Sequence, residues 1–161
     1  MRKFLTLLLL FVASLCQAQT KDRVQDLAKA IAKAEGFGRK GTLPSRLHNP
    51  GDLLSRSFHA YPGQIGLYHH YVVFRNDTAG WAALRHQIEK VISGESKYYT
   101  VNLTFKQFSK KYATSPVWVK NVTKILSISI NTPLWEFLDV APVVTTKTTL
   151  PNLWEETQWK L

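Results

Sequence analysis

The sequence predicts a mainly α-helical fold of the α+β class, in which helices surround one short, turn-rich insert. Apolar residues recur at helical spacing in several segments on both sides of this insert. Between Gly36 and Gly66, Gly and Pro residues recur too closely for a long helix or strand. The chain has 161 residues, of which 45% are hydrophobic, so one compact domain can form around a single core.

Residues 1–18 have the composition of a secretory signal peptide. Two cations precede an apolar run over residues 4–15, and Ala18 stands at a suitable cleavage site. A membrane-spanning helix needs about 20 apolar residues, so this run is too short to be a stable membrane anchor. We therefore expect a secreted or periplasmic protein with a folded domain over residues 19–142. A change in composition then marks a C-terminal tail over residues 143–161.

The chain is strongly basic. Its formal net charge is +10, and +8 remains once Arg2 and Lys3 leave with the signal peptide. Such a surplus favours an anionic partner, which could be a cell-wall polymer, an acidic membrane face or nucleic acid. Export separates the protein from nucleic acid, so we expect a wall polysaccharide. The single cysteine, Cys16, also leaves with the signal, so the mature domain folds without a disulfide.

The first helix is expected over Asp22–Glu35. Asp22 and Gln25 have the spacing of a capping box, and apolar residues follow at helical intervals. Gly36 is the type of residue at which such a helix ends. After the turn-rich insert, residues 66–74 have the composition of an extended segment.

Four further helices are expected after this extended segment. The second helix of the chain is predicted near Thr78–Ile92, where apolar residues share one face. Thr104 and Gln107 have the spacing of a capping box for a short third helix. The pairs Ser115-Pro116 and Thr132-Pro133 each place Pro at a first helical position and open two more helices.

Glu35 is the residue on which the functional prediction depends. It lies 11 positions after Val24, or three helical turns plus about 20°, so it falls on the apolar stripe of the first helix. Burial and the negative end of the helix dipole both disfavour a charged carboxylate and raise its pKa. A carboxylic acid that keeps its proton near neutral pH is suited to protonating a glycosidic oxygen. The alternative is that Glu35 extends into water from a frayed helix end.

Several short motifs follow one another in order around Glu35. Ala-Glu-Gly-Phe ends the first helix, an Asn-Pro-Gly turn follows, and a Phe precedes a Gly-Trp-x-Ala-Leu helix; Phe-x-x-Lys-Tyr-Ala and Asn-Thr-Pro-Leu come later. Over about Asp22–Asp139, this pattern resembles the bacterial and phage muralytic branch of the lysozyme-like superfamily, which includes lytic transglycosylases. The resemblance implies a lysozyme-like helical domain with a short β-hairpin flanking a cleft, and Glu35 as the catalytic glutamate.

Asp52 is the candidate for a second catalytic carboxylate. A hydrolytic lysozyme usually needs one across the cleft, and Asp52 is the only carboxylate between Glu35 and Asp77. The alternative is a local turn bond from Asp52 to backbone amides. If Asp52 faces away, Glu35 could act alone and take a proton from the sugar's own 6-hydroxyl, which gives an anhydro product. The chain lacks an obvious Glu-Ser start, since Gly36 follows Glu35, and it lacks the Gly-Leu-Met-Gln segment typical of lytic transglycosylases, so the reaction type stays open.

Substrate contacts are predicted for five residues of the insert and the extended segment. The rings of Tyr61, Tyr68 and Tyr71 could stack on sugar faces. Asn49 of the Asn-Pro-Gly turn is assigned to substrate binding, and Arg46 to the acidic groups of a wall polymer. The alternatives are core packing for the aromatic residues and a solvated loop for the arginine.

The expected function is that of a secreted peptidoglycan-cleaving glycosidase, of the lysozyme or lytic transglycosylase type. It would act as a monomer without a cofactor or metal. One alternative is a non-catalytic saccharide-binding or structural module with the same fold. Another is a zinc peptidase that uses the histidines, but their spacing matches no ligand motif. His69 and His70, as neighbours on a strand, would point to opposite faces.

Overall fold

The computed structural model describes residues 2–113 and 115–144, with side chains from residue 19 onward. Within these residues it contains six helices and one two-stranded antiparallel sheet, so the predicted α+β class is confirmed at this coarse level. The elements follow in the order α1 (Arg2–Glu35), α2 (Leu43–Arg46), β1 (Gln64–Tyr68), β2 (Tyr71–Phe74), α3 (Asp77–Ile92), α4 (Phe105–Tyr112), α5 (Pro116–Leu126) and α6 (Leu134–Leu138).

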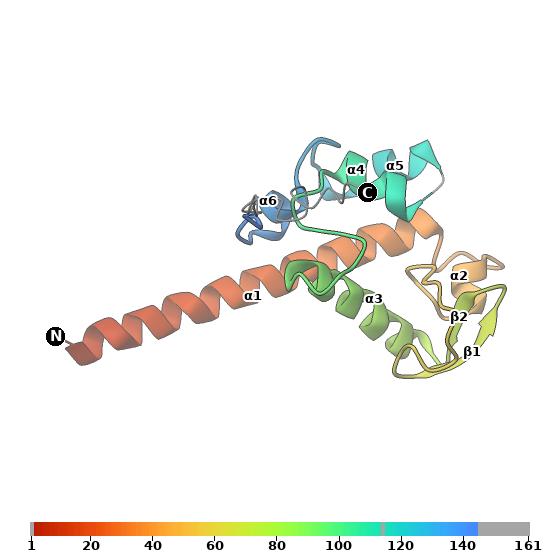
Figure 1. Ribbon diagram of the computed structural model, residues 1–161, viewed down its shortest axis with the longest axis horizontal. Helices are drawn as coiled ribbons and strands as arrows, with labels where there is room; N and C mark the ends of the chain where they lie inside the picture. The colour runs from red at the N-terminus through yellow and green to blue at the C-terminus, as the bar shows by residue number, and fades with distance from the viewer. Residues whose placement is uncertain (1, 114, 145–161) are drawn as a thin grey trace, which may run out of the picture.

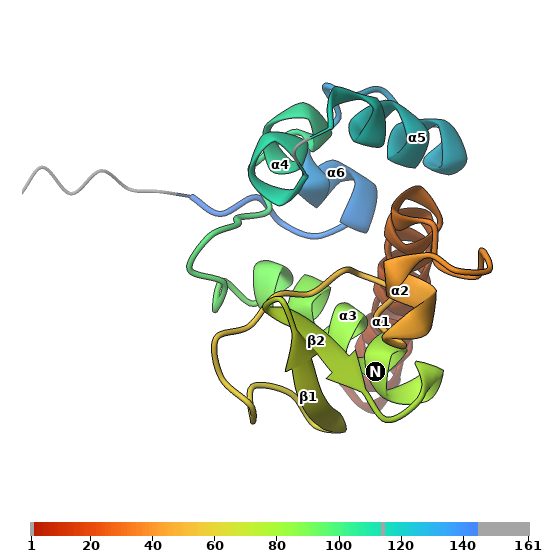
Figure 2. The same ribbon diagram turned by 90° about the vertical axis from the view of Figure 1, so that its right-hand side faces the viewer.

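Helix α1 is the central element of the molecule. It packs against α3, α5 and α6. Viewed nearly along its axis in Figure 2, α1 separates two groups of elements. We call α2, the hairpin β1–β2 and α3 the hairpin lobe, and α4, α5 and α6 the helical lobe. In Figure 1, the first half of α1 extends outward from both lobes.

The hydrophobic core follows the C-terminal half of α1 and joins the two lobes. On α1, Val24, Leu27 and Ile31 are almost completely buried. Their removal from water, together with that of the facing side chains, supplies the main favourable term in folding. The facing residues from the hairpin lobe are Phe74, Leu84 and Ile88, and those from the helical lobe are Phe105, Val122, Leu134 and Leu138.

The first helix does not begin at Asp22, as the capping-box spacing predicted. It runs without a break from Arg2 to Glu35. A cap requires non-helical backbone at the capping residue, whereas the preceding segment is rich in Leu and Ala, which favour helix. No helix among the described residues is long and apolar enough to cross a membrane. Cleavage after Ala18 stays a prediction.

The extended segment is a hairpin rather than one continuous strand. Tyr68 pairs with Tyr71, and Leu67 with Val72. His69 and His70 form the turn with φ angles of 47° and 73°, so the prediction that they alternate along a strand was wrong. Their left-handed backbone is the conformation that tight hairpin turns require.

The remaining helix starts agree with the predictions to within one residue, and the structure adds one helix. Helix α3 begins at Asp77, where the side chain of Asn76 accepts a hydrogen bond from the Ala79 amide. The capping box of α4 and the proline start of α5 are confirmed. Pro133 precedes the first residue of α6 instead of occupying it. The short helix α2 was not predicted, because its surroundings read as loop.

Most of the predicted tail lies outside the described residues. Only residues 143–144 of the range 143–161 are described. Asn102 holds Val143 by two hydrogen bonds, of 2.6 Å from its side-chain Nδ2 to the carbonyl and 3.0 Å from the Val143 amide to its Oδ1. The end of the described chain is thereby attached to the loop before α4.

Candidate active site

A groove of about 1170 Å³ is formed by residues of both lobes. Its lining comes from the end of α1, the loop after α2, β2 and α3, and from α4, α5 and α6 across from them. Glu35 and Asp52, the two predicted catalytic residues, both line this groove, as do Tyr61 and Tyr71. The fold thus brings together side chains that are widely separated in the sequence.

The backbone after Glu35 fixes this residue at the end of α1. Gly36 adopts a left-handed conformation with φ of 87°. Its amide donates to the Lys33 carbonyl at 3.2 Å, and the Phe37 amide donates to the Ala32 carbonyl at 2.9 Å. These two bonds form a Schellman motif, which turns the chain away sharply and satisfies the last carbonyls of the helix. Glu35 therefore occupies the last position that the helix can hold rigidly.

The side chain of Glu35 is partly buried and accepts a hydrogen bond from Trp118. The indole Nε1 donates to Glu35 Oε1 at 2.7 Å. Burial raises the pKa of Glu35 from 4.5 to about 7; the hydrogen bond from Trp118 opposes this rise, and the charge of Asp52 adds to it. The frayed, solvated end that was the alternative for Glu35 is not what the structure shows. A substantial fraction of the Glu35 carboxyl groups therefore holds a proton near neutral pH, as a general acid requires.

The loop that carries Asp52 is held by the buried side chain of Asn49. Asn49 Nδ2 donates to the carbonyls of Leu53 and Val72, each at 3.0 Å, and Asn49 Oδ1 accepts from the Leu53 amide at 2.9 Å. Asn49 is 0% exposed, so it has no surface for the substrate contact that was predicted for it. Its role in this structure is to brace residues 49–53 against β2.

Asp52 presents its carboxyl group to the groove from a left-handed backbone with φ of 47°. Asp tolerates this conformation better than most residues do. Its Oδ1 is buried and accepts no hydrogen bond from any of the described residues. Burial raises the pKa of Asp52 from 3.8 to about 6. The side chain is thus a carboxyl group with unused hydrogen-bonding capacity inside the groove.

Four aromatic residues of the helical lobe and the loop before it form what we call the aromatic wall of the groove, and all four line it. Phe108 and Tyr112 stack with ring centroids 5.2 Å apart, and Tyr112 lies 5.0 Å from Trp118. Tyr99 completes the set at 4.9 Å from Phe108. Trp118 of this wall contacts Glu35 directly through its hydrogen bond.

The predicted substrate-binding tyrosines lie at different places relative to the groove. Tyr61 lines it while packing on Phe74 at 5.9 Å, so it serves both core and groove. Tyr71 also lines it, and Tyr68, its cross-strand neighbour, is exposed just outside the lining. Arg46 is exposed at the end of α2 and does not line the groove.

Several groove residues were not identified from the sequence. In the sequence, Trp118 and Tyr112 are recognisable only as apolar positions on short helices, although Tyr112 belongs to the Lys-Tyr-Ala motif. Their roles depend on the packing of α4 and α5 beside α1, which no local pattern encodes. Two cations, Arg56 and Lys111, line the groove as well and were missed among many similar charges.

The histidines are dispersed over the hairpin lobe. His48 Nδ1 lies 2.6 Å from Asp77 Oδ1, and His86 Nδ1 lies 3.8 Å from Glu89 Oε2. No three His, Cys, Asp or Glu side chains in the described part of the chain come together as a set of metal ligands. A zinc-peptidase site therefore has no ligand set among these residues.

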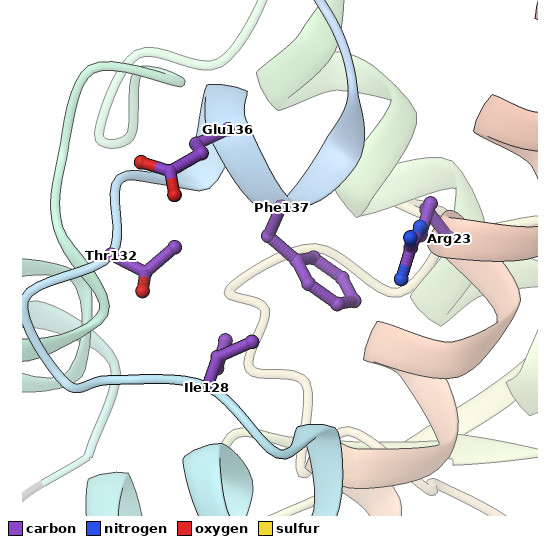
Figure 3. A pocket seen from close by; sticks show the side chains of 5 residues that line it. All are labelled: Arg23, Ile128, Thr132, Glu136 and Phe137. Carbon is purple, nitrogen blue, oxygen red and sulfur yellow. The ribbon is translucent and has the colours of Figure 1, made fainter.

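A second and smaller hollow of about 210 Å³ lies beside α6 (Figure 3). The guanidinium carbon of Arg23 is 5.4 Å from the centre of the Phe137 ring, a cation–π distance. Glu136 and Thr132 complete the polar part of its rim. The hollow shares no lining residue with the groove.

No protein-family model, curated protein or solved structure matches the chain, so the groove is interpreted from its own residues.

Proposed function

We propose that the chain is a peptidoglycan-cleaving glycosidase of the lysozyme or lytic transglycosylase type, with Glu35 as its general acid. The observation that carries this proposal is a partly buried glutamic acid, whose pKa burial raises to about 7, in a groove that a second carboxyl group also lines. Cleavage of a glycosidic bond requires a protonated acid beside the leaving oxygen and a second group that completes the reaction. The resemblance of the sequence motifs to muralytic proteins supports peptidoglycan as the substrate.

The two carboxyl groups have different protonation states over a narrow pH range. Between about pH 6 and about pH 7, these values favour the state in which Asp52 has lost its proton and Glu35 still holds one. Such a separation of pKa values assigns the acid role to Glu35 and the base or nucleophile role to Asp52. The rate is then expected to follow a bell-shaped pH profile with limits near these two values.

Two chemical routes fit this pair. In hydrolysis, Glu35 protonates the leaving oxygen. Asp52 either takes a proton from the attacking water, or attacks the anomeric carbon to form a glycosyl-enzyme whose bond to Asp52 is then broken by water. In the transglycosylase route, Glu35 protonates the same oxygen and then accepts the proton of the sugar's 6-hydroxyl, whose oxygen bonds to the anomeric carbon. The first route gives a reducing end, and the second gives an anhydro end.

Replacement of Glu35 by Gln tests the proposal. Gln keeps the size and accepts the Trp118 hydrogen bond, but it has no acidic proton, so release of soluble fragments from purified peptidoglycan should fall by about 100-fold or more. Glu136→Gln is the matched control, because it removes one carboxylate outside the groove and should leave the rate unchanged.

Mass spectrometry of the released fragments identifies the reaction. Anhydro ends would assign the transglycosylase route, and reducing ends the hydrolytic one. Full activity of the Glu35→Gln protein would contradict the proposal. Binding of wild-type protein to sedimented walls without new glycan ends would contradict it too, and would favour the non-catalytic module.

A further inference from the structure

We propose that Tyr112 is a positioning residue that sets the relative placement of Glu35 and Asp52 by linking the aromatic wall to the loop that carries Asp52. This inference rests on the proposed function, since it concerns the same two carboxyl groups. Tyr112 is the last residue of α4 in the helical lobe, whereas Asp52 belongs to the hairpin lobe. Its contacts reach both sides of the groove.

On the Asp52 side, the link is a hydrogen bond to the preceding residue. The Tyr112 hydroxyl donates to the Gly51 carbonyl at 2.5 Å. Gly51 is tightly enclosed, because a Cβ at this position would lie 2.7 Å from Leu84 Cδ1 and 3.2 Å from the Tyr112 oxygen. The loop is therefore held between α3 and α4. Because Asp52 Oδ1 has no partner of its own in the described chain, the orientation of this carboxyl group depends on the backbone that Tyr112 holds.

On the Glu35 side, the link runs through ring packing. The centre of the Tyr112 ring lies 5.0 Å from that of the Trp118 ring, at an interplanar angle of 32°. The Phe108 ring stacks on the Tyr112 ring with the centres 5.2 Å apart. Trp118 is the residue whose Nε1 donates to Glu35. A displaced Tyr112 would thus shift the donor to the acid as well as the loop that carries the second carboxyl group.

The surroundings of Tyr112 keep its hydroxyl protonated. Burial raises the pKa of Tyr112 well above its ordinary value, and Glu35, Tyr99, Asp52 and Tyr61 each raise it further. The phenol remains a hydrogen-bond donor throughout the pH range in which the two carboxyl groups titrate. The neighbouring Lys111 ammonium donates to the Tyr98 carbonyl at 3.0 Å.

Tyr112→Phe removes the hydroxyl and keeps the ring. We expect kcat on peptidoglycan to fall about 10- to 100-fold with KM within about twofold, because misplacement of a reacting group by about 1 Å has costs of that size. We also expect the pKa of Asp52 to fall toward its ordinary value as the released loop admits water. Carboxyl-carbon NMR titration of the protein without substrate measures this change.

Ser109→Ala is the matched control. Ser109 belongs to the same helix α4 and is buried, but its hydroxyl donates to the Lys106 carbonyl at 3.0 Å and it does not line the groove. It should leave kcat and the pKa of Asp52 as in the wild type. Unchanged kcat and an unchanged Asp52 titration in Tyr112→Phe would overturn the inference.

Two arms keep this test separate from that of the proposed function. If wild-type protein cleaves no glycan, the proposed function fails, while the NMR titration still decides whether Tyr112 controls Asp52. If Tyr112→Phe does not fold, a ring-fluorinated tyrosine at position 112 replaces it, because fluorination lowers the phenol pKa with little change in size. The carboxyl-carbon NMR signal of Asp52 should then shift at the pH where the phenol ionises. A signal that stays constant through that pH would overturn the inference.

Discussion

At the scale of single residues, the groove makes protein stability depend on pH. The pKa of Glu35 is raised from 4.5 to about 7 and that of Asp52 from 3.8 to about 6. The folded protein therefore binds these protons more tightly than the unfolded chain does. Their contribution is fully present below the ordinary pKa values and is lost as the pH rises from about 4 through about 7.

We predict that replacing both groups, by Glu35→Gln with Asp52→Asn, removes this part of the pH dependence. The free energy of unfolding of the wild type should fall by on the order of 2 kcal/mol more than that of the double variant between pH 4 and pH 7.5, after allowance for solvent screening of these partly exposed groups. Urea unfolding at both pH values measures the difference. Glu136→Gln should retain the wild-type dependence, and an equal dependence in the double variant would speak against buried, protonated carboxyl groups.

At the scale of secondary structure, the end of α1 is the element that places the acid. Gly36 has φ of 87° and closes the Schellman motif after Glu35. An Ala at this position meets the Arg39 side chain only at ordinary contact distance, so its cost comes from the backbone conformation. That cost is about 1–2 kcal/mol for a residue with a Cβ.

We predict that Gly36→Ala lowers both stability and activity, because relief of the strain at residue 36 changes the direction in which Glu35 leaves the helix. Gly94→Ala provides the comparison: Gly94 follows α3 with φ of 78°, its surroundings are open, and it does not line the groove. Thermal melts should show similar losses in the two variants, whereas fragment release should fall only in Gly36→Ala. Equal activity of the two variants would count against a placing role for this helix end.

The sequence predicts individual elements better than it predicts the groove. Caps such as Thr104 with Gln107, and the glycine after Glu35, act through neighbours a few residues away, so they can be recognised without knowledge of the fold. The predicted start of the first helix at Asp22 was wrong, because a capping-box spacing has no effect inside a continuous helix. Glu35 was identifiable from its position on an apolar stripe. Asn49 was misassigned, because nothing local reveals that its amide braces β2.

The groove residues contributed by the helical lobe could not be assigned for a different reason. Trp118 is separated from Glu35 by 83 positions, and Tyr112 from Gly51 by 61. Such pairs depend on how whole helices pack against α1. An aromatic residue on a short amphipathic helix looks the same in sequence whether it fills the core or contacts a carboxyl group.

At the scale of the whole molecule, one wall of the groove is built from a segment without acidic residues. Residues 96–135, which include α4 and α5, contain no Asp or Glu but carry Lys97, Lys106, Lys110, Lys111, Lys120 and Lys124. The segment therefore carries only positive formal charges, and its Lys111 lines the groove. An anionic glycan would be attracted to it over distances set by the ionic strength.

We predict that activity on anionic peptidoglycan depends strongly on salt. Raising the ionic strength from about 0.1 M to about 1 M shortens the Debye length from about 10 Å to about 3 Å, so KM should rise several-fold while kcat changes little. An uncharged oligosaccharide with the same backbone is the control and should show a constant KM. Lys120→Gln with Lys124→Gln should weaken the salt effect, and an effect of equal size on the uncharged substrate would rule out this explanation.

The outward extension of α1 bears on how the protein matures. The first fully buried side chain described on this helix is Val24, and residues 19–23 are exposed or only partly covered. A peptidase that cuts after Ala18 would therefore act more than one helical turn before Val24. Such a cut would shorten α1 and leave its buried residues, from Val24 onward, in the folded body around Glu35.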